Sequence, residues 1–192
     1  MSEQVKTILF ILILGVFTSV ILLGMDLITE ERIIENEEAL KEAAILDGFE
    51  ISYSPSSINE TFTEHVTIEE INEYTFYTDT DTGRISFYFE GSGLWGPITG
   101  ILTLESDFET IAHISVLAQE ETPGLGGVVG SREYLDMFVE KEMEISIVKT
   151  TQPLTNSQVD SITGATRTSD LFEIVLNENY REYLAVWQAN QE

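Results

Sequence analysis

The chain of 192 residues contains no cysteine. It can therefore form no disulfide, no thiolate metal site and no cysteine-ligated iron–sulfur cluster, and it offers no cysteine nucleophile. Histidine is almost as scarce. His65 and His113 lie in unrelated contexts, and His113 falls in an alternating run where an ordinary strand position is expected. We predict no metal site, so any redox chemistry must come from an organic cofactor.

Basic residues are also few, with nine Lys and Arg against 34 Asp and Glu, for a formal net charge of −25. Glu3 and Lys6 cancel, so the whole excess lies on residues 26–192. Because this charge repels a phosphate backbone, nucleic acid is excluded as a natural partner. A charge of this kind is usually a solvated surface, and it is consistent with the outer face of a membrane.

One long hydrophobic run is present. Residues 7–25 carry no charge, and a helix of that length spans roughly 28 Å, about the thickness of a bilayer's hydrocarbon core. A cleaved signal peptide is the alternative, but its apolar region would be shorter, and residues 22–26 offer no good cleavage site. We predict a cytoplasmic tip and transmembrane anchor over residues 1–26. Lys6 before the run and acidic residues after it predict a cytoplasmic N-terminus, with the rest outside the cytoplasmic membrane.

Periodicity predicts one α+β domain behind this single transmembrane helix. An amphipathic helix is expected over residues 28–46, closed by Asp47 and Gly48, within a linking segment of residues 27–49. Residues 50–70 are expected to form a loop with one short strand at most. The following domain, residues 50–192, should hold a mainly antiparallel sheet. Strands are predicted over residues 74–78, 85–89, 98–104, 110–117 and 144–149, and helices over residues 132–141 and 169–187.

The stretch from Asp160 to Ser169 is rich in hydroxyls and runs into the last predicted helix. Gly164 and Ala165 let a bulky group approach the backbone. A helix that begins near Thr168 or Ser169 would offer free N–H groups and a positive dipole end to a phosphate. The alternative is that Thr168 or Ser169 only caps the helix. On these residues alone, capping is the more ordinary interpretation.

The same stretch resembles the flavinylation motif Asp-x-x-(Ser/Thr)-Gly-Ala-Thr of the FMN-binding domain family. The residues at its fixed positions are Asp160, Thr163, Gly164, Ala165 and Thr166. In that family the final threonine forms a phosphoester with FMN, which a flavin transferase installs. The resemblance therefore implies covalent FMN on Thr166, with Asp160 recognised by the transferase.

Two further segments resemble the family in the expected order. Residues 93–100 are similar to its Gly-Leu-Trp loop, and residues 121–126 match its Glu-Thr-Pro-Gly-Leu-Gly loop. The resemblance implies that Trp95 and Leu125 pack on the faces of the flavin ring. It also implies that backbone N–H groups around Leu125 and Gly126 bond its polar edge. The other predicted cofactor residues are Leu94, Glu121, Thr122, Gly124, Thr168 and Lys149.

Each of these residues also has an ordinary structural interpretation. Trp95 could be core packing, the glycines could serve turns, and Glu121 could be a surface loop residue. Lys149 and Arg167 are candidate partners for the phosphate or the ring, although exposed bases are common.

Family members with one anchor and one FMN domain are typical of ion-translocating oxidoreductase complexes of the Rnf and Nqr types. The resemblance implies an electron-transfer subunit whose partners are other membrane subunits, including iron–sulfur and second-flavin subunits. A free-standing extracytoplasmic flavoprotein that donates electrons to a reductase is one alternative. A module that binds flavin or a partner only structurally is another. The chain has no nucleotide-binding fingerprint, so we do not expect it to oxidise NADH directly.

Overall fold

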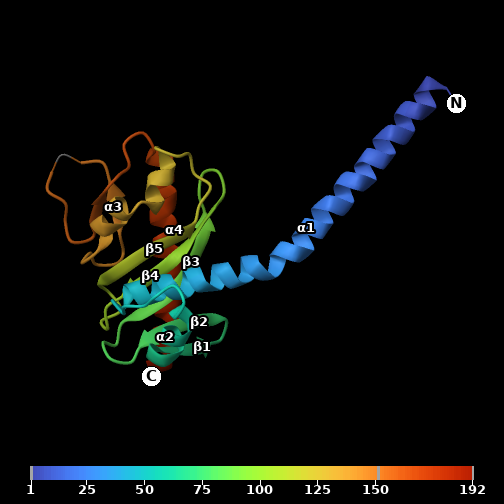
Figure 1. Ribbon diagram of the computed structural model, residues 1–192. Coiled ribbons are helices and arrows are strands. Elements are labelled where there is room, and N and C mark those ends of the chain that lie inside the picture. The colour runs from blue at the N-terminus through green and yellow to red at the C-terminus, as the bar shows by residue number, and fades with distance from the viewer. Residues whose placement is uncertain (1, 151, 192) are drawn as a thin grey trace. The chain divides into compact units, whose positions relative to one another are not determined.

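The computed structural model describes residues 2–150 and 152–191 and divides into two compact units, Met1–Ala39 and Leu40–Glu192. The first unit consists of the N-terminal part of helix α1, which spans Glu3–Gly48 (Figure 1). The large hydrophobic side chains between residues 8 and 25 are 46–70% exposed. Among the described residues, α1 is the one helix long and apolar enough to cross a membrane, which fits the predicted anchor.

The predicted helix over residues 28–46 forms the C-terminal part of α1, with no break after the apolar run. The helix ends at Gly48, as the Asp47-Gly48 pair predicts. Glycine is required there because a Cβ atom would lie 2.2 Å from Oγ1 of Thr103 on the sheet. The domain boundaries after residues 26 and 49 stay predictions.

The second unit is built on a five-stranded sheet in the order β1-β2-β3-β4-β5, with every neighbouring pair antiparallel. The predicted α+β class with a mainly antiparallel sheet is therefore confirmed. A separate parallel pair joins two short strands, β6 and β7, and places Val148 opposite Asp160. The strands are β1 (Val66–Ile71), β2 (Tyr74–Asp79), β3 (Ile85–Ser92), β4 (Pro97–Leu104), β5 (Ile111–Ala118), β6 (Ser146–Val148) and β7 (Gln158–Asp160).

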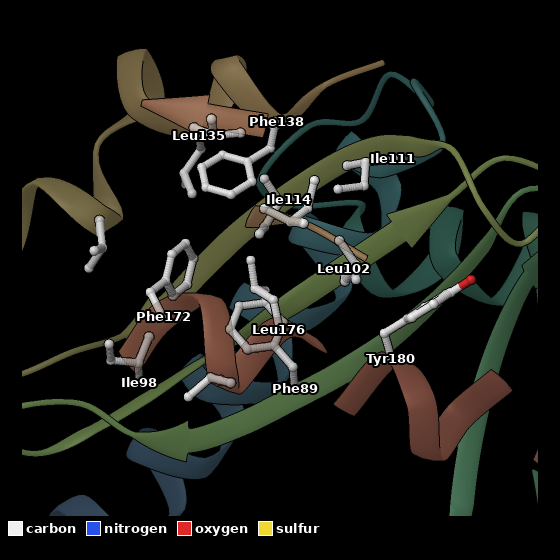
Figure 2. Packing of buried hydrophobic residues seen from close by; sticks show 14 of the residues in the cluster. Phe89, Ile98, Leu102, Ile111, Ile114, Leu135, Phe138, Phe172, Leu176 and Tyr180 are labelled. Atoms are coloured by element: carbon white, nitrogen blue, oxygen red, sulfur yellow. The ribbon is translucent and has the colours of Figure 1, made fainter. Parts of the chain in front are cut away.

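Helix α4, Thr166–Gln191, covers one face of the sheet. Figure 2 shows its Phe172, Leu176 and Tyr180 beside Phe89 and Leu102 of the strands. Phe138, from the segment that follows β5 in the chain, packs in the same cluster. Burying an aromatic or aliphatic side chain of this size contributes about 1.5–3 kcal/mol. The core on this face therefore holds α4 against the sheet.

The opposite face of the sheet is covered by the end of α1 and by helix α2, Ile58–His65. Ile45 and Leu46 of α1 and Phe62 of α2 pack in one buried cluster with Tyr77 and Ile101. Strand alternation explains the two cores, since neighbouring side chains on a strand point to opposite faces.

Several sequence predictions are wrong in detail. Residues 50–70 contain helix α2, which was not predicted, and then enter β1, the one short strand that was allowed there. The helix predicted over residues 132–141 ends at residue 138, as helix α3 (Arg132–Leu135) followed by the 3-10 turn η2 (Asp136–Phe138). Strand β7 was not predicted, and α4 begins three residues before the predicted start. A second 3-10 turn, η1, spans Gly126–Gly130.

His113 is buried on β5 opposite Thr103, as the predicted strand position requires. Its Nε2 atom lies 3.0 Å from Oγ of Ser115 and 3.0 Å from Nη1 of Arg132. Burial, and next the positive charge of Arg132, lower the pKa of His113, while Asp47 and Asp136 act in the opposite direction. The folded protein therefore holds this imidazole neutral at a pH where an exposed histidine takes up a proton.

We expect acid to weaken the fold through His113. Below about pH 6.5 the unfolded chain binds a proton that the folded chain does not, so the free energy of unfolding falls as pH falls. One such proton gives a slope of at most about 1.4 kcal/mol per pH unit. Urea unfolding of the full chain between pH 7 and pH 5, followed by tryptophan fluorescence, should show this slope. His113→Gln should flatten it, and His65→Gln should not. A slope unchanged in His113→Gln would contradict the assignment.

Candidate functional site

The first predicted motif forms the tight turn between β3 and β4. The N–H of Gly93 donates to the carbonyl of Gly96 over 2.8 Å, which places Leu94 and Trp95 at the tip. Their side chains are 44% and 68% exposed. Core packing is therefore the wrong interpretation for Trp95, because an indole in the core would be mostly buried.

The second motif follows β5 and turns sharply at Gly124, whose φ is +75°. The carbonyl of Thr122 accepts from the N–H of Leu125 at 3.1 Å and from that of Gly127 at 3.0 Å. The N–H of Leu125 thus closes the turn. That N–H groups around Leu125 and Gly126 bond the ring edge stays a prediction. The Leu125 side chain is 45% exposed and remains available as a contact surface.

The third motif links β7 to α4. Its N–H at Ala165 donates to the carbonyl of Ile162 over 3.0 Å, and Gly164 has a φ of +83°. A Cβ atom on Gly164 would lie 3.2 Å from Cδ2 of Leu125, so the second and third motifs are in contact. Thr166 is exposed and begins α4, which puts its hydroxyl at the surface in the first helical turn.

The start of α4 also decides the capping question. Because the helix begins at Thr166, neither Thr168 nor Ser169 precedes it, and the capping interpretation is wrong. The Ser169 hydroxyl accepts from the N–H of Ile162 and donates to the carbonyl of Ala165. Ser169 therefore holds the turn that presents Thr166.

Glu121 connects all three motifs. Its carboxylate is buried, with the residue 4% exposed. Oε1 accepts from the N–H groups of Leu94 at 2.6 Å and Trp95 at 3.2 Å, and Oε2 accepts from the hydroxyl of Thr168 at 2.8 Å. The surface-loop interpretation of Glu121 is therefore wrong.

Two motif glycines are required by this carboxylate. A Cβ atom on Gly93 would lie 2.6 Å from Oε1 of Glu121. One on Gly126 would lie 2.5 Å from Oε2 and 2.6 Å from Oγ1 of Thr168. The first and second motifs can close over Glu121 only because these positions have no side chain.

A pocket of about 520 Å³ lies beside Thr166, within the usual size of small-molecule sites. It is lined by Lys149, Thr150, Asp160, Ser161, Ile162, Thr163, Gly164 and Thr166. A second pocket, of about 400 Å³, surrounds the β3–β4 turn at residues 90–97. A larger pocket of about 630 Å³ lies at His113 and Arg132 and contains none of the predicted site residues.

Charge around the first pocket favours an anion at one edge. Arg84, Arg132 and Arg181 all form ion pairs with carboxylates. Across residues 2–150 and 152–191, no such pair is found for Lys149, which lines the pocket, or for Arg167, which follows Thr166. Asp160 is the one carboxylate among the lining residues, and its negative charge acts against the two positive charges.

These features fit FMN. Thr166 supplies an exposed hydroxyl beside a pocket of hydroxyl side chains and one lysine, which suits a phosphate. Leu94, Trp95 and Leu125 are large apolar side chains left exposed on an acidic domain, which suits a flat aromatic ring. Gly164 lines the pocket and contacts Leu125.

The sequence missed some of the lining residues. Thr150, Ser161 and Ile162 line the pocket, although none was singled out. Ser169, which was considered only at the start of the helix, holds the acceptor turn. Ser161 and Ile162 lie at the variable positions of the flavinylation motif, so no residue type marked them. Thr122 and Gly124 shape the turn of the second motif and do not line either pocket at the motifs.

The geometry of this site fits a planar, phosphate-bearing cofactor. Residues 93–180 match the model of the FMN-binding domain family. The NqrC protein of the Na(+)-translocating NADH-quinone reductase of Vibrio alginolyticus is 30% identical over 105 residues, which is 50% of this chain and 41% of that protein. Its counterpart in Pseudomonas aeruginosa is 32% identical over 107 residues, with the same two coverages. The match thus spans about two fifths of these curated relatives.

A solved structure shares the fold. The crystal structure of NqrC from the Na(+)-translocating NADH-quinone reductase of Parabacteroides distasonis superposes with a TM-score of 0.68. It is 22% identical and covers 81% of this chain and 96% of that chain. The architecture of the α+β domain therefore recurs in the Parabacteroides distasonis protein.

Proposed function

We propose that the chain carries FMN as a phosphoester on the side chain of Thr166. The observation that carries this proposal is the meeting of three separate motifs around Glu121, with the Thr166 hydroxyl exposed beside them. The acceptor is Thr166 rather than Thr163, because Thr166 occupies the last position of the motif. Asp160 is recognised by the flavin transferase, which accounts for a carboxylate beside a phosphate pocket.

The neighbouring residues then have distinct tasks. Lys149 neutralises phosphate charge from the edge of the pocket, and the hydroxyl groups of Thr150 and Thr163 donate hydrogen bonds. Leu94, Trp95 and Leu125 cover the ring and exclude water from it. A flavin can accept or release one or two electrons, so it links one-electron and two-electron carriers.

We further propose that the chain is an electron-transfer subunit of a membrane-bound, ion-translocating oxidoreductase complex of the Nqr or Rnf type. The names of its relatives and its exposed apolar helix support this role. Its partners would be polytopic membrane subunits with iron–sulfur and second-flavin centres. The second candidate is a free-standing extracytoplasmic flavoprotein, which the combination of one anchor and one domain also suits.

The proposal is tested by the absorption spectrum of the full chain, produced with and without a flavin transferase. With the transferase, the visible flavin bands should stay with the chain through denaturation and gel filtration. Without it, they should elute as free flavin or be absent. Flavin released by denaturation in both preparations would contradict a covalent bond.

We expect residues 26–192 to lie outside the cytoplasm. An ester bond keeps the cofactor where lost FMN could not readily be replaced, and the charge flanking residues 7–25 favours the same orientation. Protease added to intact spheroplasts should digest the domain. Full protection until the cells are lysed would contradict this topology.

A further inference from the structure

Glu121 is a buried carboxylate without a cation. Within the described residues it forms no ion pair, and its two oxygens are bonded to Leu94, Trp95 and Thr168. Burying a charge is costly, and hydrogen bonds from three donors offset that cost. A neutral side chain would fill the same space at lower cost, so stability alone does not explain a carboxylate here.

The three bonds control the positions of the exposed apolar side chains. Leu94 and Trp95 lie on a tip of two residues, and both of their N–H groups point to one oxygen of Glu121. The other oxygen holds Thr168, two residues after Thr166 on α4. Glu121 also begins the loop that carries Leu125, which touches Gly164. One side chain therefore sets the distances between Trp95, Leu125 and the acceptor threonine.

We propose that Glu121 is a positioning residue, which holds the tip of the β3–β4 turn and the residue 121–126 loop against the first turn of α4 before any flavin is attached. This inference rests on the proposed function, because it takes Leu94, Trp95 and Leu125 as the side chains that contact the ring. Side chains that are already held in their binding positions reduce the ordering cost of binding a flat aromatic ligand. Both oxygens of Glu121 are occupied within the protein, so its contribution to the flavin is indirect.

Amide hydrogen exchange of the full chain, produced without flavin transferase and measured by NMR in detergent, tests the flavin-free state. The Leu94 and Trp95 amides should exchange at least about tenfold more slowly than unprotected amides, although their side chains are exposed. In Glu121→Ala this protection should be lost. Exchange of these amides at the unprotected rate in the unmutated chain would overturn the proposal without reference to any variant.

Two matched variants separate position from charge. Glu120→Ala removes the same side chain from the adjacent exposed position and should leave both amides protected. Glu121→Gln keeps an oxygen for the Leu94 and Trp95 amides and an N–H for the Thr168 hydroxyl. It should therefore retain protection where Glu121→Ala does not. Loss of protection in Glu120→Ala to the same extent as in Glu121→Ala would also overturn the proposal.

The flavin itself gives a second measurement, which would not change if Glu121 only stabilised the fold. In the chain that carries attached flavin, the visible circular dichroism of the ring reports how asymmetrically it is held. Glu121→Ala should lose most of this signal while keeping its covalent flavin, and Glu121→Gln should restore it. An unchanged signal in Glu121→Ala would contradict the proposal. Absence of covalent flavin in the unmutated chain would instead contradict the proposed function, and it would leave the exchange result valid.

Discussion

Thr166→Ala should remove all covalently attached flavin while leaving the domain folded. The substitution deletes the hydroxyl that the proposed ester requires, because Thr166 occupies the last position of the motif. Thr166 is exposed at the start of α4, so its loss opens no cavity, and among the described residues its side chain makes no hydrogen bond that would be lost. On a denaturing gel viewed under ultraviolet light, the fluorescent band should be absent. The far-ultraviolet circular dichroism should match the unmutated chain.

Two matched variants make this result specific. Thr166→Ser keeps a hydroxyl at the same position and should retain fluorescence, at least in part. Thr163→Ser, in the same pocket, keeps the motif's permitted residue and should label normally. A fluorescent band that persists in Thr166→Ala would show that the acceptor is another residue.

The second large effect should appear in the assembled complex. A complex that carries Thr166→Ala should be reduced by its primary donor as far as the centre that precedes this chain. It should then fail to reduce the final acceptor, with turnover near background. The physical reason is that the chain has no cysteine and among its described residues no cluster of metal ligands. In the proposed relay, the flavin on Thr166 is the one redox centre assigned to this chain.

Stopped-flow reduction of each centre in the complex measures this directly, and Thr166→Ser provides the matched control for assembly. A complex with Thr166→Ala that fails to assemble would be recognised by its missing subunits on a native gel. Near-normal turnover in an assembled Thr166→Ala complex would contradict the relay. It would favour the free-standing flavoprotein.

The central strands were predictable because their pattern is local. Phe87 and Phe89 alternate with more polar residues on β3, and the structure buries both completely against α4. The elements that were missed, or that were expected without a position, lack such a pattern. β1 is an edge strand paired only with β2, and its central residues, 67–70, are all exposed. Helix α2 buries Phe62 alone, and β7 is three residues long and depends on pairing with β6.

The site was predictable as a set of motifs but not as an arrangement. Thr166 could be singled out from its neighbours, whereas the bond between Thr168 and Glu121 joins positions 47 residues apart. Nothing local to Glu121 indicates that its carboxylate is buried. The early start of α4 escaped prediction because Thr166 and Thr168 are weak helix formers, and the hydrogen bonds of Ser169 to Ile162 and Ala165 hold the entry.

The intact mass of the denatured full chain, produced with a flavin transferase, tests the central claim most directly. We expect an increase equal to FMN less one water, carried by the peptide that contains Thr166 after proteolysis, and no increase in Thr166→Ala. Non-covalent flavin would leave under these conditions. The unmodified mass in a preparation that is yellow before denaturation would contradict a phosphoester on Thr166.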